Sequence, residues 1–328
     1  MRTTRRAWHR LAAAGLCAAL AAATLEAKVQ SCRFAAASPP PVYRVPGDAQ
    51  QLEPILRPSL ERMPEGDFID TALSVGAALY PLSANERTNV MPKLRNAYAR
   101  IESDPDFARV QSALPYCFAA APNSNGHYFM CRPAIVPKRP KTIIFLHGFG
   151  GNLLLYTWLL KEEFPTALIL APSWGASWYN GSMPYLKDMI RDAERRTGAI
   201  ISMPLLVGIS AAGPVGFRIY NANPTSFCGY VCLASAPDSA TTTNLLASLR
   251  VLMINGSTDD MAPIAEVRSR ATLARHCIPS LETKELPADH FFLLTRRAET
   301  CALIRKFWQT KPAQPAPAKK PVRKRSGK

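Results

Sequence analysis

The sequence lacks the residue spacings that typically hold metal ions or nucleoside phosphates. It has only 5 histidines in 328 residues, and it contains neither a Cys-x-x-Cys nor a His-Glu-x-x-His motif. Its glycine-rich segment, His147-Gly-Phe-Gly-Gly151, is not followed by the lysine and threonine of a Walker phosphate loop. We therefore expect neither a metal centre nor a cofactor.

Long hydrophobic runs are also scarce. The longest covers only residues 11–23 and follows four arginines within the first ten residues. It is shorter than the roughly 20 residues needed to cross a bilayer, and Ala23 and Ala27 offer small residues for cleavage. This pattern predicts a signal peptide over residues 1–27. The mature chain is then expected to be exported, periplasmic or secreted, and to have no transmembrane segment.

Acidic residues are few, 24 against 40 lysines and arginines. Much of the excess lies in residues 311–328, which carry seven basic residues, several prolines and no acid, and are expected to be a disordered tail. The tail could bind an anionic polymer of the cell envelope, or it could simply keep the protein soluble. Nucleic acid is not an expected partner of an exported protein.

Seven of the 8 cysteines lie beyond the predicted signal peptide. Cys117 and Cys131 flank a turn-like segment, residues 123–126, between two strand-like runs, so they could face each other as a disulfide across a hairpin. Cys228 and Cys232 lie on one predicted strand, about 13 Å apart at ~3.3 Å per residue, and cannot pair with each other.

Residues 28–112 are predicted to form a proline-rich linker and a helical extension. Ser83 stands three residues before Glu86, the capping-box spacing, and apolar residues then recur on one helical face. We expect these helices to pack on the domain that follows them in the chain; that they roof a pocket of that domain is the alternative.

Residues 113–310 alternate strand-like and helical segments. Strands are predicted at residues 142–146, 167–170, 205–209, 230–233 and 251–254, and helices at 153–164, 184–196 and 211–220. This alternation predicts an α/β domain with a mostly parallel sheet covered on both faces. In such a sheet, ligands bind at the carboxyl ends of the strands.

Ser210 follows one of these strands in the sequence Gly-Ile-Ser-Ala-Ala-Gly, which leads directly into a helix. A strand, a Gly-x-Ser turn and a helix form the context of a nucleophile elbow, although Ala212 stands where glycine is usual. A serine hydroxyl needs a base to accept its proton and an acid to orient that base.

Asp259 and His290 follow Ser210 in the order expected for this architecture. Asp259 lies in a loop three residues after Gly256, with Asp260 and Asp238 as alternative acids. His290 lies in a late loop that follows a strand-like segment, residues 281–286.

Two further groups complete the expected site. The amides of Phe149 and Ala211 are candidate oxyanion donors, each typically worth ~3 kcal/mol in the transition state. Trp174, Trp178 and Phe291 are candidate substrate-binding residues; packing in the core is the alternative for these aromatic side chains.

The segment HGFGG, the GISAAG turn, Asp259 and His290 together resemble the α/β-hydrolase superfamily over roughly residues 115–310, and more loosely resemble secreted polyhydroxybutyrate-depolymerase and feruloyl-esterase-like enzymes. The resemblance implies a serine hydrolase that cleaves small-molecule or polymeric esters. A serine peptidase or amidase and a non-catalytic envelope-binding protein remain as alternatives. Because no long insertion follows residues 230–233, small or accessible esters are favoured.

Overall fold

The computed structural model of the protein describes residues 29–41, 53–79, 83–118, 125–178, 180–238 and 245–310. The predicted signal peptide and the basic tail lie outside these residues. No helix of the described segments combines the length and apolar character that crossing a membrane would require.

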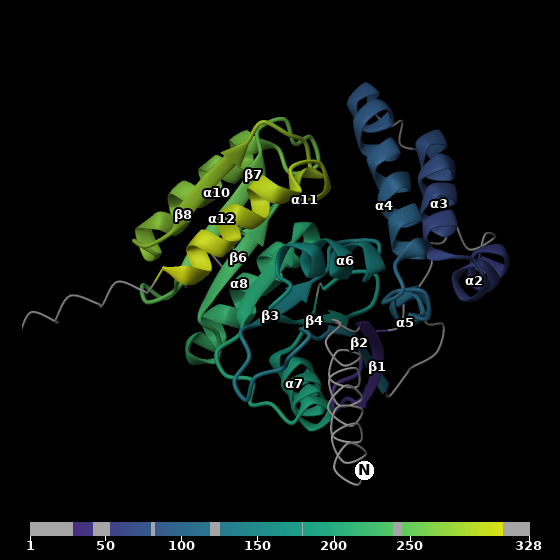
Figure 1. The fold of residues 1–328 in the computed structure, drawn as a ribbon. Coiled ribbons are helices and arrows are strands. Elements are labelled where there is room, and N and C mark those ends of the chain that lie inside the picture. The colour runs from purple at the N-terminus through teal and green to yellow at the C-terminus, as the bar shows by residue number, and fades with distance from the viewer. Residues whose placement is uncertain are drawn as a thin grey trace, which may run out of the picture.

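One eight-stranded sheet forms the centre of the molecule, in the order β1-β2-β4-β3-β5-β6-β7-β8 (Figure 1). The strands β4, β3, β5, β6, β7 and β8 are parallel to their neighbours, whereas β2 is antiparallel to both β1 and β4. In chain order the strands are β1 (Val29–Ala35), β2 (Asn125–Cys131), β3 (Thr142–Leu146), β4 (Leu168–Ser173), β5 (Leu205–Ile209), β6 (Gly229–Leu233), β7 (Val251–Gly256) and β8 (Glu282–Leu286). The predicted mostly parallel sheet is confirmed.

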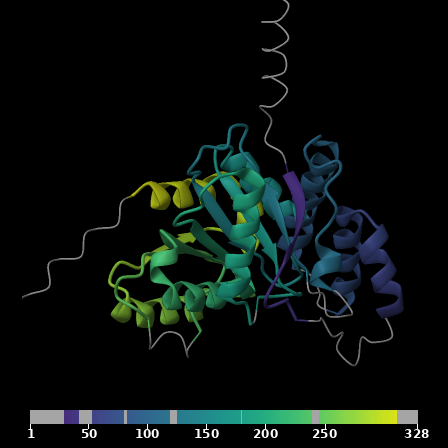
Figure 2. The same ribbon diagram turned by 90° about the horizontal axis from the view of Figure 1, so that it is seen from below.

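Helices cover both faces of the sheet (Figure 2). Strand β3 shows why, because its five residues are all buried and alternate between the two faces. Ile143 and Phe145 pack towards α4, α6 and α12, while Ile144 and Leu146 pack towards α7, α8 and α10. The helices are α2 (Glu53–Arg62), α3 (Glu65–Leu79), η2 (Glu86–Val90), α4 (Met91–Ser103), α5 (Leu114–Cys117), α6 (Leu154–Glu163), α7 (Met183–Thr197), η3 (Ser210–Ala212), α8 (Gly213–Ala222), η4 (Pro224–Ser226), α10 (Ile264–Cys277), α11 (Phe292–Thr295) and α12 (Arg297–Gln309).

The helical extension begins as the sequence predicts. The amide of Glu86 donates to Ser83 Oγ at 3.1 Å, and the amide of Ser83 donates to Glu86 Oε2 at 2.7 Å, which is a capping box. The apolar face that follows it along η2 and α4 is buried, and α2, α3 and α4 lie together to one side of the sheet (Figure 1).

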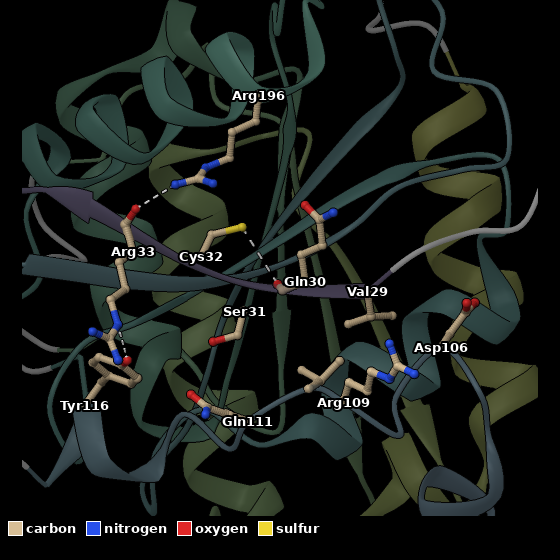
Figure 3. A pocket seen from close by; sticks show the side chains of 11 residues that line it. Val29, Gln30, Ser31, Cys32, Arg33, Asp106, Arg109, Gln111, Tyr116 and Arg196 are labelled. Atoms are coloured by element: carbon tan, nitrogen blue, oxygen red, sulfur yellow. Dashed lines mark hydrogen bonds between the residues drawn. The ribbon is translucent and has the colours of Figure 1, made fainter. Parts of the chain in front are cut away.

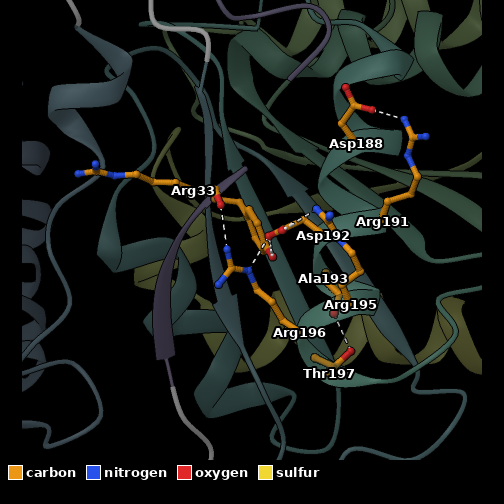
Figure 4. Close-up of polar contacts among 9 residues, drawn as sticks. Arg33, Asp188, Arg191, Asp192, Ala193, Arg195, Arg196 and Thr197 are labelled. Atoms are coloured by element: carbon orange, nitrogen blue, oxygen red, sulfur yellow. Dashed lines mark hydrogen bonds and ion pairs between the residues drawn. The ribbon is translucent and has the colours of Figure 1, made fainter. Parts of the chain in front are cut away.

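Strand β1 is the main element that sequence analysis did not predict. It pairs along its full length with β2, at the edge of the sheet. A guanidinium of α7 holds it there: Arg196 donates to the carbonyl oxygen of Arg33 at 2.8 Å and to Asp192 Oδ2 at 2.6 Å (Figure 4). The segment expected to be a linker thus also contributes to the sheet.

The predicted hairpin between Cys117 and Cys131 is wrong. Cys117 ends the short helix α5, while Cys131 ends β2, whose antiparallel neighbours are β1 and β4. Both thiols are buried and free. Because β1 occupies the position beside β2, the segment before residue 118 has no strand partner there.

Candidate active site

Ser210 is the first residue of η3 and lies at a sharp turn directly after β5. Its φ of 53° falls in the left-handed region, which is sparsely populated by residues other than glycine. Gly208 makes the turn possible, because a Cβ there would lie 2.7 Å from Tyr230 Oη and 3.0 Å from the Ala212 carbonyl oxygen. The methyl group of Ala212 itself is accommodated in the core. The local sequence therefore holds the Ser210 hydroxyl at the carboxyl end of β5.

The structure brings Ser210, His290 and Asp259 into one hydrogen-bonded row. Ser210 Oγ lies 2.9 Å from His290 Nε2, and His290 Nδ1 lies 2.8 Å from Asp259 Oδ2. Since a carboxylate can only accept, Nδ1 carries the proton and Nε2 is free to accept one from the serine. This is the arrangement of an activated nucleophile.

Backbone contacts hold Asp259 and His290 side by side. Asp259 is buried, and its Oδ1 accepts the amides of Met261 at 2.9 Å and Ala262 at 2.8 Å, which leaves Oδ2 for the histidine. Gly256 allows the two loops to approach, because a Cβ there would lie 2.3 Å from the carbonyl oxygen of Ala288. The sequence spacing between Gly256 and Asp259 therefore has a structural reason.

The other two candidate acids lie elsewhere. Asp238 forms an ion pair with Arg218 at 2.6 Å, and Asp260 is exposed in the loop beyond Asp259. The carboxylate that contacts His290 is that of Asp259.

The glycine-rich loop after β3 passes directly against Ser210. A Cβ at Gly148 would lie 3.1 Å from Ser210 Cβ. The loop contains Phe149, and Ala211 follows Ser210 near the start of η3, where an amide has no acceptor within the helix. Both candidate oxyanion donors therefore lie next to Ser210 in the chain or in space.

His147 fixes the start of this loop through two hydrogen bonds of its ring. Its Nδ1 donates to the Gly148 carbonyl oxygen at 2.8 Å, and its Nε2 accepts the Trp174 amide at 3.1 Å. Burial lowers the pKa of His147 to about 4, so the imidazole is neutral at pH 7. Its role is to connect the ends of β3 and β4.

A cavity of about 440 Å³ opens onto Ser210 and His290. Phe291 lines it, as predicted, and so do residues of the helical extension, which the sequence did not assign to the site. The residues that the extension contributes are Phe68, Ile69, Ala72 and Leu73 of α3, Glu86 and Val90 of η2, and Met91 and Leu94 of α4. The alternative in which these helices roof the pocket is thus the observed arrangement. The apolar periodicity of α3 and η2–α4 was the signal that could have indicated it.

Trp174 and Trp178 do not line this cavity, and the prediction that they bind substrate there is wrong. They are 4% and 0% exposed, and their rings stack at 5.6 Å between centroids. Tyr185 of α7 packs edge-on against Trp174 at 4.9 Å. The alternative interpretation, core packing, applies to both.

A second cavity, of about 540 Å³, lies against β1 (Figure 3). Arg33, Arg109 and Arg196 line it together with Tyr116, whose hydroxyl accepts a hydrogen bond from Arg33. None of the residues that the sequence assigned to the site lies in this cavity.

The order of the strands and the turn at Ser210 together define the class of fold to which the structure belongs. A mostly parallel eight-stranded sheet with a nucleophile elbow after a central strand is the α/β-hydrolase fold.

Several solved structures are similar to the chain at low identity. The Pyrococcus furiosus esterase Pf2001 is 14% identical, with a TM-score of 0.47, over 58% of this chain and 88% of the esterase. A predicted CIB-like hydrolase from Thermoplasma acidophilum is 16% identical, with a TM-score of 0.44, over 56% and 92%. A ferulic acid esterase is 12% identical, with a TM-score of 0.46, over 57% and 94%. No protein-family model and no curated protein matches the sequence.

Proposed function

We propose that the protein is a serine hydrolase that cleaves carboxylic esters through an acyl-enzyme intermediate. The observation that carries this proposal is the hydrogen-bonded row of Ser210, His290 and Asp259 at the mouth of a cavity. The 2.9 Å between Ser210 Oγ and His290 Nε2 lies within the range required for proton transfer from nucleophile to base, and the 2.8 Å between His290 Nδ1 and Asp259 Oδ2 lets the carboxylate orient that base.

The reaction follows from the positions of these groups. His290 Nε2 takes the proton of Ser210 as Oγ attacks the ester carbonyl, and the buried Asp259 carboxylate stabilises the imidazolium that forms. The amides of Phe149 and Ala211 are proposed to bind the developing oxyanion. The imidazolium then gives its proton to the departing alcohol. Water, deprotonated by His290, releases the acid and restores the serine.

A fluorophosphonate probe and an ester assay test this proposal. Wild-type protein should be labelled at Ser210 and should hydrolyse p-nitrophenyl acetate and butyrate, and Ser210→Ala should lose both properties. Ser269→Ala provides a matched control, because Ser269 is an exposed serine on α10, and it should keep both. Undiminished turnover by Ser210→Ala would refute the role of Ser210.

The same assay separates the competing functions. Peptidyl p-nitroanilides turned over faster than the esters would indicate a peptidase or amidase. A folded protein that neither labels nor turns over would indicate a non-catalytic binding protein.

We further propose that the protein is exported and that its tail contacts an anionic envelope polymer, on the basis of the sequence of residues 1–27 and 311–328. Cell fractionation with N-terminal analysis of the mature chain tests export. A pull-down on anionic envelope polymer, with and without residues 311–328, tests the tail.

A further inference from the structure

The cavity at Ser210 is built from two halves that are distant in the sequence. The catalytic domain supplies α6, α11 and the loops of Phe149 and His290, and the helical extension supplies α3, η2 and α4. Any group that enters the cavity from Ser210 therefore meets both halves.

The extension is anchored to the catalytic domain on one side by a buried carboxylate. Glu65, the first residue of α3, accepts hydrogen bonds from the Leu154 amide at 2.7 Å, Tyr98 Oη at 2.8 Å and Ser112 Oγ at 2.8 Å. These donors come from α6, from α4 and from the segment before α5. Helix α3 is thus attached to α6, which also lines the cavity.

A second contact connects the helical extension to the loop that carries His290. The side-chain amide of Asn85, just before η2, donates to the carboxylate of Asp289, the residue that precedes His290. Helix α11, which follows this loop, also packs against η2 and α4. Helices α3, η2 and α4 are therefore held in a defined position beside Ser210 and His290.

The lining of the cavity is almost entirely apolar. Besides Ser210 and His290, its polar side chains are those of Glu86 and Tyr156. The Glu86 carboxylate already accepts the Ser83 amide in the capping box. A polar group placed inside would lose its bonds to water with few partners to replace them, whereas a hydrocarbon chain would gain from burial.

Apolar side chains also extend to the solvent at the edge of the cavity. Phe149 and Met261 both line it, and they are 66% and 65% exposed. Such exposed apolar groups beside a pocket are typical of a surface that receives an apolar ligand.

We propose that the cavity binds a hydrocarbon chain of the ester and that α3 sets the length of chain that fits. The proposal rests on the proposed ester hydrolysis and specifies its substrate class. It replaces the expectation of small esters, which considered only an insertion after β6 and not a roof supplied by the N-terminal helices.

The test varies the acyl chain with a constant leaving group. In wild-type protein, kcat/KM for p-nitrophenyl acetate, butyrate, octanoate and palmitate should rise by up to about fourfold for each methylene group buried, until the cavity is full. Leu73→Trp places an indole on the cavity side of α3 and should lower the octanoate-to-acetate ratio of kcat/KM at least about tenfold.

Thr71→Trp is the matched control. Thr71 is exposed on α3 and does not line the cavity, so the same added bulk should leave the ratio unchanged. If Leu73→Trp fails to fold, Leu73→Ala serves instead, and its enlarged cavity should move the optimum to a longer chain.

Alkyl acetates of increasing alcohol length form the second arm. Chain dependence in this series alone would place the alcohol chain in the cavity, and dependence in the first series would place the acyl chain there; either supports the proposal. Equal kcat/KM across both series would overturn it. Equal chain-length ratios for Leu73→Trp and Thr71→Trp, measured in the series that shows chain dependence, would also overturn it. Serine-dependent turnover with no chain dependence would leave ester hydrolysis intact, whereas absence of turnover and of fluorophosphonate labelling would remove the proposed function itself.

Discussion

The buried carboxylate of Glu65 predicts an unusual dependence of stability on pH. Glu65 is 6% exposed, and burial raises its pKa from 4.5 to about 7, against hydrogen bonds from Ser112, Tyr98 and Leu154 that lower it. Between pH 4.5 and 7 the folded protein holds a proton that the unfolded chain has lost. The contribution of this group to stability is therefore complete below pH 4.5 and is lost as the pH rises through about 7.

The magnitude follows from the two pKa values. At 1.36 kcal/mol for each pH unit, the interval from 4.5 to about 7 corresponds to about 3 kcal/mol of unfolding free energy. Glu65→Gln removes this dependence while keeping the shape of the side chain. Its carbonyl oxygen can accept from Leu154 and Tyr98, and its amide can donate to Ser112 Oγ, which can act as an acceptor.

The assay is urea unfolding of both proteins at pH 5, 6, 7 and 8, followed by tryptophan fluorescence. Relative to Glu65→Gln, the wild type should lose about 2.5 kcal/mol of unfolding free energy over this range, because part of the loss already lies below pH 5. Other titrating groups are common to both proteins and cancel in the difference. A difference that stays constant, or a wild type that gains stability as the pH rises, would refute the reasoning, because it would mean that the three donors outweigh burial and keep Glu65 ionised.

Three further variants test the site and the core. Asp259→Asn should lower kcat by about 10⁴-fold in the p-nitrophenyl butyrate assay, because an amide no longer holds His290 with its proton on Nδ1; kcat near the wild-type value would exclude Asp259 as the acid. Gly216→Ala should cost about 1–3 kcal/mol of unfolding free energy in urea, since its Cβ would lie 2.3 Å from the Tyr230 ring, and a neutral result would mean that the ring can move away. Trp178→Ala should cost about 3–5 kcal/mol in the same measurement; a higher KM without loss of stability would instead return the indole to the substrate site.

The sequence by itself determined the features that depend on neighbouring residues. The strands at β3 and β5, the capping box at Ser83 and the turn at Ser210 all follow from side chains a few positions apart. The order of Ser210, Asp259 and His290 indicated that their loops would meet, because each follows a strand and the carboxyl ends of parallel strands share one edge of the sheet.

Only the tertiary structure decided what each apolar surface packs against. An apolar stripe shows that a helix face is buried, but α3 and α4 bury theirs over a cavity as well as against the catalytic domain. Trp174 and Trp178, which follow β4, are also apolar, but they lie in the core, where Trp174 packs against Tyr185 and Trp178 packs against His147. Strand β1 is polar at several positions, and pairing with β2 stabilises it. These outcomes depend on contacts between distant segments, which local sequence patterns do not specify.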